Sequence, residues 1–233
     1  MRKPVLFLII IAGLLLVSSG ILQAEDKEIS RLDERIQNCI SLFEEIMQMP
    51  DKGIPEDLLA DSCGIAIFPS VIKGGFIVGG RYGKGIVLYH NPETGEWSAP
   101  AFYTVKGLSY GLQIGGQAID LILVVTTDRG MRSFLNNELS LGGDVAVAAG
   151  PVGRTAAADT DLRLKASIFS YSRSKGLFAG ISLKGAIIRP DDKANEKYYG
   201  QKLTPEDILY AGKVKPTPTA QQLIEVLEKY SKK

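Results

Sequence analysis

Glycine in the middle of the chain is the sequence feature that most constrains the fold. Twenty of the 25 glycines lie between residues 64 and 188, where the apolar runs are short and rich in Val, Ile, Phe and Tyr. β-Branched and aromatic residues favour strands. Glycine inside a strand marks a bulge, a tight bend or a close approach of two backbones. Together these features predict a strongly curved, barrel-like antiparallel sheet.

Local patterns locate parts of this sheet. Residues 91–95, Asn-Pro-Glu-Thr-Gly, predict a turn between two strands. Apolar and polar residues alternate over residues 162–168, which predicts a strand with one buried face. Residues 119–125 are apolar on both faces except for Asp120, which predicts a central strand. A short helix is expected near residues 129–136.

The two ends of the chain carry helical patterns. Over residues 27–49 apolar side chains recur every three or four positions with charged residues between them, which predicts an amphipathic helix. A short helix is expected to begin at Pro55, and residues 205–210 and 219–230 predict two more. The fold class is therefore α+β, a curved, barrel-like antiparallel sheet flanked by an N-terminal amphipathic helix and C-terminal helices.

The first 24 residues predict a signal peptide. Arg2 and Lys3 precede an uncharged apolar run, and small or polar residues follow it. Cleavage after Gly20 and cleavage after Ala24 both fit. An uncleaved anchor is the alternative, because residues 4–24 carry no charge and number about the ~20 needed to span a bilayer. We expect residues 25–233 to be one exported domain, periplasmic or secreted and able to associate with a membrane.

Charge and composition argue against several functions. Without its first 24 residues the chain holds 25 basic and 26 acidic side chains, so it lacks the basic surface expected of a nucleic-acid-binding protein. One histidine and two cysteines cannot build a Cys/His zinc site. The spacing of Asp144, Asp159 and Asp161 matches no calcium-binding loop. We therefore expect no metal, no cofactor and no nucleic-acid partner.

One motif suggests an enzyme. Residues 107–111, Gly-Leu-Ser-Tyr-Gly, match the nucleophile elbow of hydrolases, which requires a strand-to-helix turn and a histidine later in the chain. No helical pattern follows Ser109, and the single histidine, His90, precedes it. From its position at the end of a strand, His90 is expected to be a surface residue. We expect a protein without enzymatic activity and keep a serine hydrolase using Ser109 as a remote alternative.

Three further side chains have roles that the sequence leaves open. Asp120 is expected to be a buried carboxylate paired with an Arg or Lys for structure, and catalysis is the alternative. Cys39 and Cys63 either form a disulfide between the first helix and the sheet or remain two separate buried thiols.

Four ordered blocks carry a resemblance to a known family. They are GIAIFPSVIKGGFIVGGRYGKG (64–85), GLQIGGQAIDLILVV (111–125), LGGDVAVAAGPVGR (141–154) and SYSRSKGLFAG (170–180). The chain resembles the SYLF family, also called the Ysc84 actin-binding domain, as a bacterial exported member. The resemblance implies binding of phosphoinositides or other anionic phospholipids at a membrane surface. The alternative is a protein-interaction or envelope-structural module, since some eukaryotic members bind actin.

A peripheral membrane site needs cations for phosphate and apolar side chains for the interface. Three segments of the chain supply both kinds of residue, on what we expect to be neighbouring loops. The residues expected to bind lipid are Lys73, Arg81, Tyr82, Lys84, Arg173, Lys175 and Phe178, with Ile72 and Leu177 as apolar neighbours. The alternative is that each segment is an ordinary hairpin turn with a solvated cation.

Overall fold

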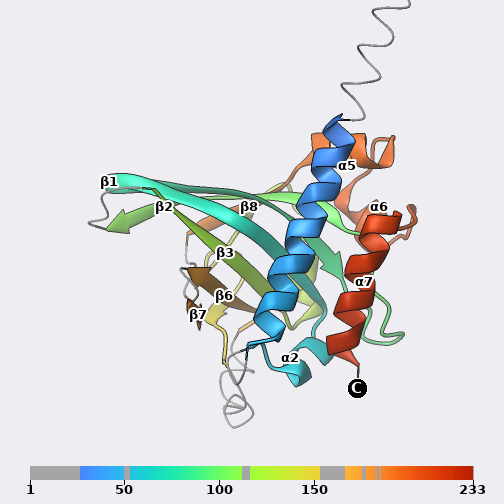
Figure 1. The fold of residues 1–233 in the computed structure, drawn as a ribbon, viewed down its shortest axis with the longest axis horizontal. Helices are drawn as coiled ribbons and strands as arrows, with labels where there is room; N and C mark the ends of the chain where they lie inside the picture. Colours follow the sequence, from blue (N-terminus) through green and yellow to red (C-terminus); the bar gives the residue numbers. More distant parts are fainter. Residues whose placement is uncertain are drawn as a thin grey trace, which may run out of the picture.

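A mostly antiparallel sheet forms the centre of the computed structural model, which describes residues 27–49, 53–111, 116–152, 166–174, 177–181, 183 and 185–232. Within these residues eight strands follow the order β4-β8-β2-β1-β3-β6-β5, and β7 pairs with β6. The strands are β1 (Gly64–Tyr89), β2 (Ala101–Gly111), β3 (Gly116–Val125), β4 (Leu139–Ser140), β5 (Val147–Ala149), β6 (Ile168–Ser174), β7 (Leu177–Gly180) and β8 (Ala186–Pro190). The sheet curls into a half-barrel, and helices cross one of its faces (Figure 1).

The long strand β1 explains the curl. Its residues 64–74 pair with β3 and its residues 77–87 pair with β2, so its two neighbours lie along different halves. A bulge in the first half places Ser70 at a φ of 54°, and bulges bend strands. The two halves of β1 approach so closely that a Cβ on Gly85 would overlap the carbonyl oxygen of Ile67. The glycines therefore allow the close backbone approach that the sequence predicted.

The helices lie on both faces of this sheet. They are a helix over residues 27–47, α2 (Glu56–Ala60), α3 (Asp128–Arg132), which continues into a 3₁₀ turn (Ser133–Leu135), α5 (Asp192–Tyr199), α6 (Pro205–Leu209) and α7 (Pro218–Ser231). Helix 27–47, α2, α5 and α7 share one apolar core with the sheet, and we call that side the helix face. The 3₁₀ turn, α6 and one residue of α3 share a second core on the opposite face.

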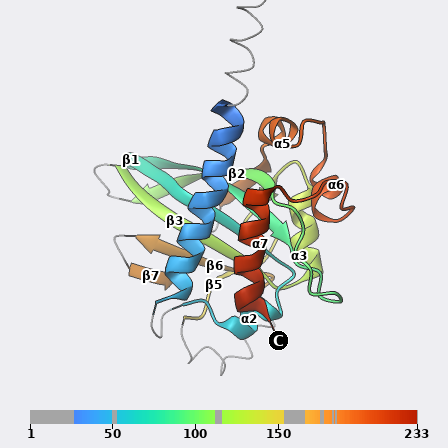
Figure 2. The same cartoon turned by 45° about the vertical axis from the view of Figure 1, so that its right-hand side comes forward.

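Helix 27–47 is fixed firmly to the helix face. Its residues Ile36 and Phe43 are fully buried, as the amphipathic pattern predicted, and Cys39 beside them is fully buried as well. Figure 2 shows it beside α7, and Gln37 Nε2 donates to Gln222 Oε1 of that helix at 2.7 Å. This helix forms one wall of the pocket described below.

The main predictions of secondary structure are confirmed. Gly95 has a φ of 74° in the turn at residues 91–95, β3 lies between β1 and β6, and α3 with its 3₁₀ turn lies where a short helix was expected. The α+β class with a curled antiparallel sheet is confirmed as well. The signal segment, residues 162–165 of the alternating pattern, Asp159 and Asp161 lie outside the described residues.

Candidate basic pocket on the helix face

An open pocket of about 340 Å³ lies between helix 27–47 and β1. We call it the basic pocket, because three cations and one acid are among the residues that line it. The lining includes Arg31, Glu34, Arg35, Ser70, Ile72, Tyr82 and Lys84. An opening of this size accepts one or two side chains or a small polar group of a larger ligand.

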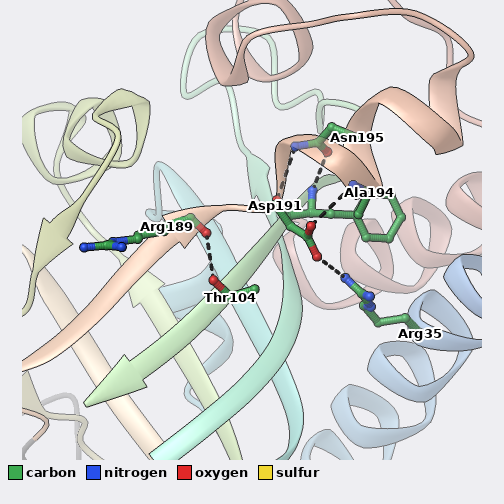
Figure 3. Close-up of polar contacts among 7 residues, drawn as sticks. Arg35, Thr104, Arg189, Asp191, Ala194 and Asn195 are labelled. Atoms are coloured by element: carbon green, nitrogen blue, oxygen red, sulfur yellow. Dashed lines mark hydrogen bonds and ion pairs between the residues drawn. The ribbon is translucent and has the colours of Figure 1, made fainter. Parts of the chain in front are cut away.

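Arg35 is held by two neighbouring side chains at the pocket. Its Nη1 donates to Asp191 Oδ2 at 3.4 Å (Figure 3). Its guanidinium carbon lies 5.2 Å from the centroid of the Phe102 ring. The Arg35 side chain is only 13% exposed. An ion pair on one side and a ring on the other hold its planar guanidinium in one orientation.

The partners of Arg35 are fixed in turn by α5. Asp191 caps this helix by accepting from the Ala194 backbone N–H at 3.3 Å. Asn195 holds the Phe102 backbone, because its Oδ1 accepts from Phe102 N at 2.7 Å and its Nδ2 donates to Phe102 O at 3.3 Å (Figure 3). Arg35 is therefore positioned before any ligand arrives.

The strand side of the pocket presents exposed side chains from β1. Ile72 is 62% exposed and Tyr82 is 43% exposed, and Lys84 is exposed as well. The ammonium of Lys106 on β2 lies 5.7 Å from the centroid of the Tyr82 ring, which extends the positive surface across the sheet. This arrangement offers cations and apolar surface on one rim.

An ion-pair network lies next to the pocket. Asp120 Oδ1 accepts from the Ser70 backbone N–H at 2.9 Å, and its Oδ2 accepts from Arg173 Nε at 2.9 Å. Arg173 also donates to Glu45 of helix 27–47. Burial alone would lower the pKa of Arg173, but the hydrogen bonds to Glu45 and Asp120 and the attraction to both acids raise it overall. The expectation that Asp120 pairs with a basic residue is confirmed, and Arg173 is committed to this structural network.

The structure separates the residues that were expected to bind lipid. The loop placement was wrong for Lys73, Arg81, Tyr82 and Lys84, because all four lie within the continuous strand β1. Tyr82 and Lys84 line the basic pocket with Ile72. Lys73 and Arg81 belong to the opposite face, because neighbouring residues of a strand point to opposite sides.

The opposite-face position of Arg81 is visible in its packing. A Cβ on Gly107 would lie 3.3 Å from the Arg81 side chain. Gly107 lies two positions after Val105 on β2 and therefore shares its face, and the Val105 side chain is in the opposite-face core. The Arg81 Nε is buried without a hydrogen-bond partner among the described residues, and burial lowers the pKa of this arginine. Arg81 therefore cannot act in the same pocket as Lys84.

The third expected segment contributes little to a common surface. Phe178 is only 8% exposed and stacks on Tyr171 with ring centroids 5.3 Å apart, so it is a core residue and cannot enter a membrane interface. Lys175 lies outside the described residues. Leu177 is 74% exposed, and it pairs with Ser174 of β6. Ser174 is the neighbour of Arg173 along that strand, so Ser174 and Leu177 lie on the face opposite Arg173.

Sequence reasoning missed the helix residues of the pocket. Arg31, Glu34 and Arg35 fall on the polar side of the amphipathic pattern, where charged residues are ordinary. Nothing local distinguishes them from other solvated charges, because the pocket exists only where the helix packs against β1.

Part of the chain matches a known protein family. Residues 106–230 match the family model described as Ysc84, Las17-binding protein actin regulator. The chain belongs to the Ysc84 family. The matched segment begins at Lys106, so the family model itself does not include the pocket residues of helix 27–47 and β1.

Relatives in the Ysc84 family are similar over most of this chain. It is 41% identical over 185 residues to SH3 domain-containing YSC84-like protein 1 of Bos taurus, which covers 79% of this chain and 53% of that protein. It is 38% identical over 181 residues to LAS seventeen-binding protein 3 of Saccharomyces cerevisiae, which covers 76% of this chain and 39% of the yeast protein. The chain therefore spans about half the length of its mammalian relative and less of the yeast one.

The description of the Ysc84 family names regulation of actin and no reaction. The serine motif of this member also lacks the strand-to-helix turn of a nucleophile elbow. Residues 107–111 all lie in β2, and Ser109 pairs with Gly79 of β1 in a regular antiparallel ladder.

The surface position expected for His90 was wrong. His90 is 3% exposed, and its ring stacks on that of Trp97 with ring centroids 4.3 Å apart. Its Nδ1 lies 2.8 Å from the carbonyl oxygen of Ser62.

Three further findings on this Ysc84 member concern its cysteines, metal binding and membrane spans. Cys39 and Cys63 are free buried thiols, so the disulfide alternative is wrong. In the described part of the chain, no three His, Cys, Asp or Glu side chains are grouped so that they could hold a metal ion. None of the described helices is both long enough and apolar enough to cross a membrane.

Proposed function

We propose that this Ysc84-family chain is a non-enzymatic interaction module that binds a protein partner at the basic pocket. The observation that carries the proposal is the pocket itself, in which the fixed Arg35 lies near the exposed Tyr82 and Lys84. Tyrosine and arginine are enriched where proteins bind one another. A protein partner is supported by the family description as Las17-binding and by the name of the yeast relative.

The chemistry of the described residues supports binding without catalysis. The thiol of Cys39 is fully buried, and burial raises its pKa far above the usual range, so it stays protonated and unreactive. Burial likewise raises the pKa of Tyr103 and Tyr199, which keeps both phenols neutral. Among the residues that line the basic pocket, Glu34 is the one carboxylate, and no nucleophile is paired with a base.

Anionic phospholipid is the second candidate ligand, and the exposed Ile72 beside three cations favours it. Each cation near an anionic membrane contributes about 1 kcal/mol, and burying an isoleucine side chain adds about 2 kcal/mol. These terms give roughly 5 kcal/mol, which corresponds to sub-millimolar binding. Leu177 cannot add to this surface because it belongs to the other face of the sheet. We therefore rank a protein partner above a membrane surface.

Site-specific photocrosslinking in the native cells tests the proposal on the full chain. A photoreactive p-benzoylphenylalanine replaces Tyr82 at the pocket, and a matched control carries it at Leu177, which is also exposed but lies outside the pocket. We expect a protein adduct of defined mass from position 82 and none of that mass from position 177. Adducts with lipid alone at position 82, or no discrete adduct there, would overturn the proposal.

A further inference from the structure

We infer that the partner contacts this chain through an acidic segment, one carboxylate of which enters the basic pocket beside Arg35. The inference rests on the proposed function and adds the chemistry of the partner. It follows from the charge of the pocket, from the orientation of Arg35 and from the small apolar area on the rim.

The charge of the pocket matches a carboxylate. Arg31, Arg35 and Lys84 against Glu34 give the lining a net charge of +2 (three minus one), and Asp191 beside Arg35 reduces this to +1. Without its first 24 residues the chain holds 25 basic and 26 acidic side chains, so the positive excess at the pocket is local. A single carboxylate neutralises a site of charge +1. A phosphate monoester bears up to two negative charges and would leave an excess of negative charge beside Glu34.

The pocket cations already act on a carboxylate of the chain itself. The pKa of Glu28 is lowered, first by a hydrogen bond from Lys197 and further by attraction to Arg31 and Lys84. The positive potential therefore reaches the first turn of helix 27–47. An incoming acidic segment meets this potential before it makes contact, which favours its association.

Arg35 offers a prepared contact for a second carboxylate. A guanidinium carries five N–H donors, and the described contact with Asp191 uses Nη1 alone. The remaining donors match the two oxygens of a carboxylate in a planar arrangement. Because Asp191 and Phe102 already fix the side chain, binding costs little additional conformational entropy.

The rim favours a peptide over a bilayer. Ile72 and Tyr82 are the exposed large apolar side chains at this pocket, and Lys106 lies over the Tyr82 ring. This surface suits one or two apolar side chains flanking an acidic residue. A membrane interface needs a wider apolar face, and the exposed Leu177 is on the other side of the sheet.

The test measures fluorescence anisotropy of a labelled short peptide of Glu and Leu, titrated with the full chain. A control peptide carries Gln in place of every Glu. The pocket variant combines Arg31→Glu and Lys84→Glu, which change exposed side chains. The matched variant makes the same charge change at Lys202 and Lys215, which are also exposed and do not line the pocket. Circular dichroism checks the fold of both variants.

We expect the Glu peptide to bind more tightly than the Gln peptide, and its binding to weaken as salt rises. The pocket variant should lose at least about tenfold in affinity, and the matched variant should lose clearly less. Equal binding of both peptides, or equal loss in both variants, would overturn the inference. Binding of phosphatidylserine vesicles by the native chain, lost in the pocket variant, with no binding of the Glu peptide, would assign the pocket to lipid instead.

The two proposals fail in different ways. A protein adduct at position 82 together with a negative peptide titration rejects the acidic segment and leaves the interaction module standing. Absence of that adduct rejects the interaction module, whatever the peptide does.

Discussion

Arg173 Nε donates to Asp120 Oδ2 at 2.9 Å across a paired position of β6 and β3. The contact explains why a carboxylate interrupts an otherwise apolar strand. Asp120 also accepts from the Ser70 backbone, so one acid joins two strands to the bulge of β1. Arg173 reaches on to Glu45, which ties helix 27–47 to the same point.

This network predicts a loss of stability on Asp120→Ala. The substitution leaves the Ser70 N–H and the guanidinium of Arg173 without their acceptor, at side chains that are about one-fifth exposed. We expect the free energy of unfolding to fall by roughly 1–3 kcal/mol in urea denaturation. In a double-mutant cycle with Arg173→Ala, the two losses should not add. Fully additive losses would show that the two side chains do not interact.

The close approach within β1 predicts that Gly85→Ala is strongly destabilising. The added Cβ would overlap the backbone oxygen of Ile67, which cannot move aside as a flexible side chain can. We expect a cost on the order of 2–3 kcal/mol, measured by thermal or urea unfolding. Gly107→Ala is the control, because its Cβ meets its nearest neighbours at 3.2–3.3 Å and one of them is the Arg81 side chain. A smaller cost at Gly85 than at Gly107 would contradict the curl described for β1.

The pKa of Asp207 predicts a dependence of stability on acid pH. A hydrogen bond from Lys213, followed by hydrogen bonds from Thr204, lowers the pKa of Asp207 from 3.8 to about 2. Because the folded pKa lies below the unfolded value, the contribution is present above about pH 4 and is lost as pH falls toward 2. Carboxyl NMR titration of the folded chain should find the low value. In Asp207→Asn, stability should vary less with pH over this interval, and an unchanged slope would contradict the assignment.

The amino-terminal pattern predicts export and removal of the signal segment. Arg2 and Lys3 before an uncharged apolar run should direct the chain out of the cytoplasm, and cleavage should leave a mature chain that begins at Ile21 or Glu25. Intact-mass measurement of protein from the envelope and secreted fractions checks this prediction. A detergent-extracted form that retains Met1 would indicate an uncleaved anchor.

Much of the fold could be predicted because its local signals are strong. The period of helix 27–47 indicates a helix and its buried side, and the apolar run of β3 indicates a central strand that is buried on both faces. The placement of β1 residues in loops was wrong because its glycines resemble turn signals, whereas in the folded chain they permit a curl inside one continuous strand.

The candidate site depended on contacts that the sequence does not specify. Alternation along β1 is enough to place Tyr82 and Lys84 on one face and Arg81 on the other, once the strand is known to be continuous. No local pattern, however, indicates which helix covers that face. Arg35 and Lys84 are separated by 49 positions in the chain and line one pocket only because helix 27–47 packs there.

By itself, the sequence determined the helical ends, the strand character of the middle, the α+β class and the expectation that Asp120 needs a basic partner. These follow from hydrophobic periodicity, from backbone sterics and from the cost of burying an unpaired charge, all of which act locally. Only the tertiary structure decided that the partner is Arg173, that Phe178 is in the core and that Arg31 and Arg35 meet Lys84. Those relationships depend on how a long strand curls and where a helix packs, and long-range packing is set by the whole chain at once.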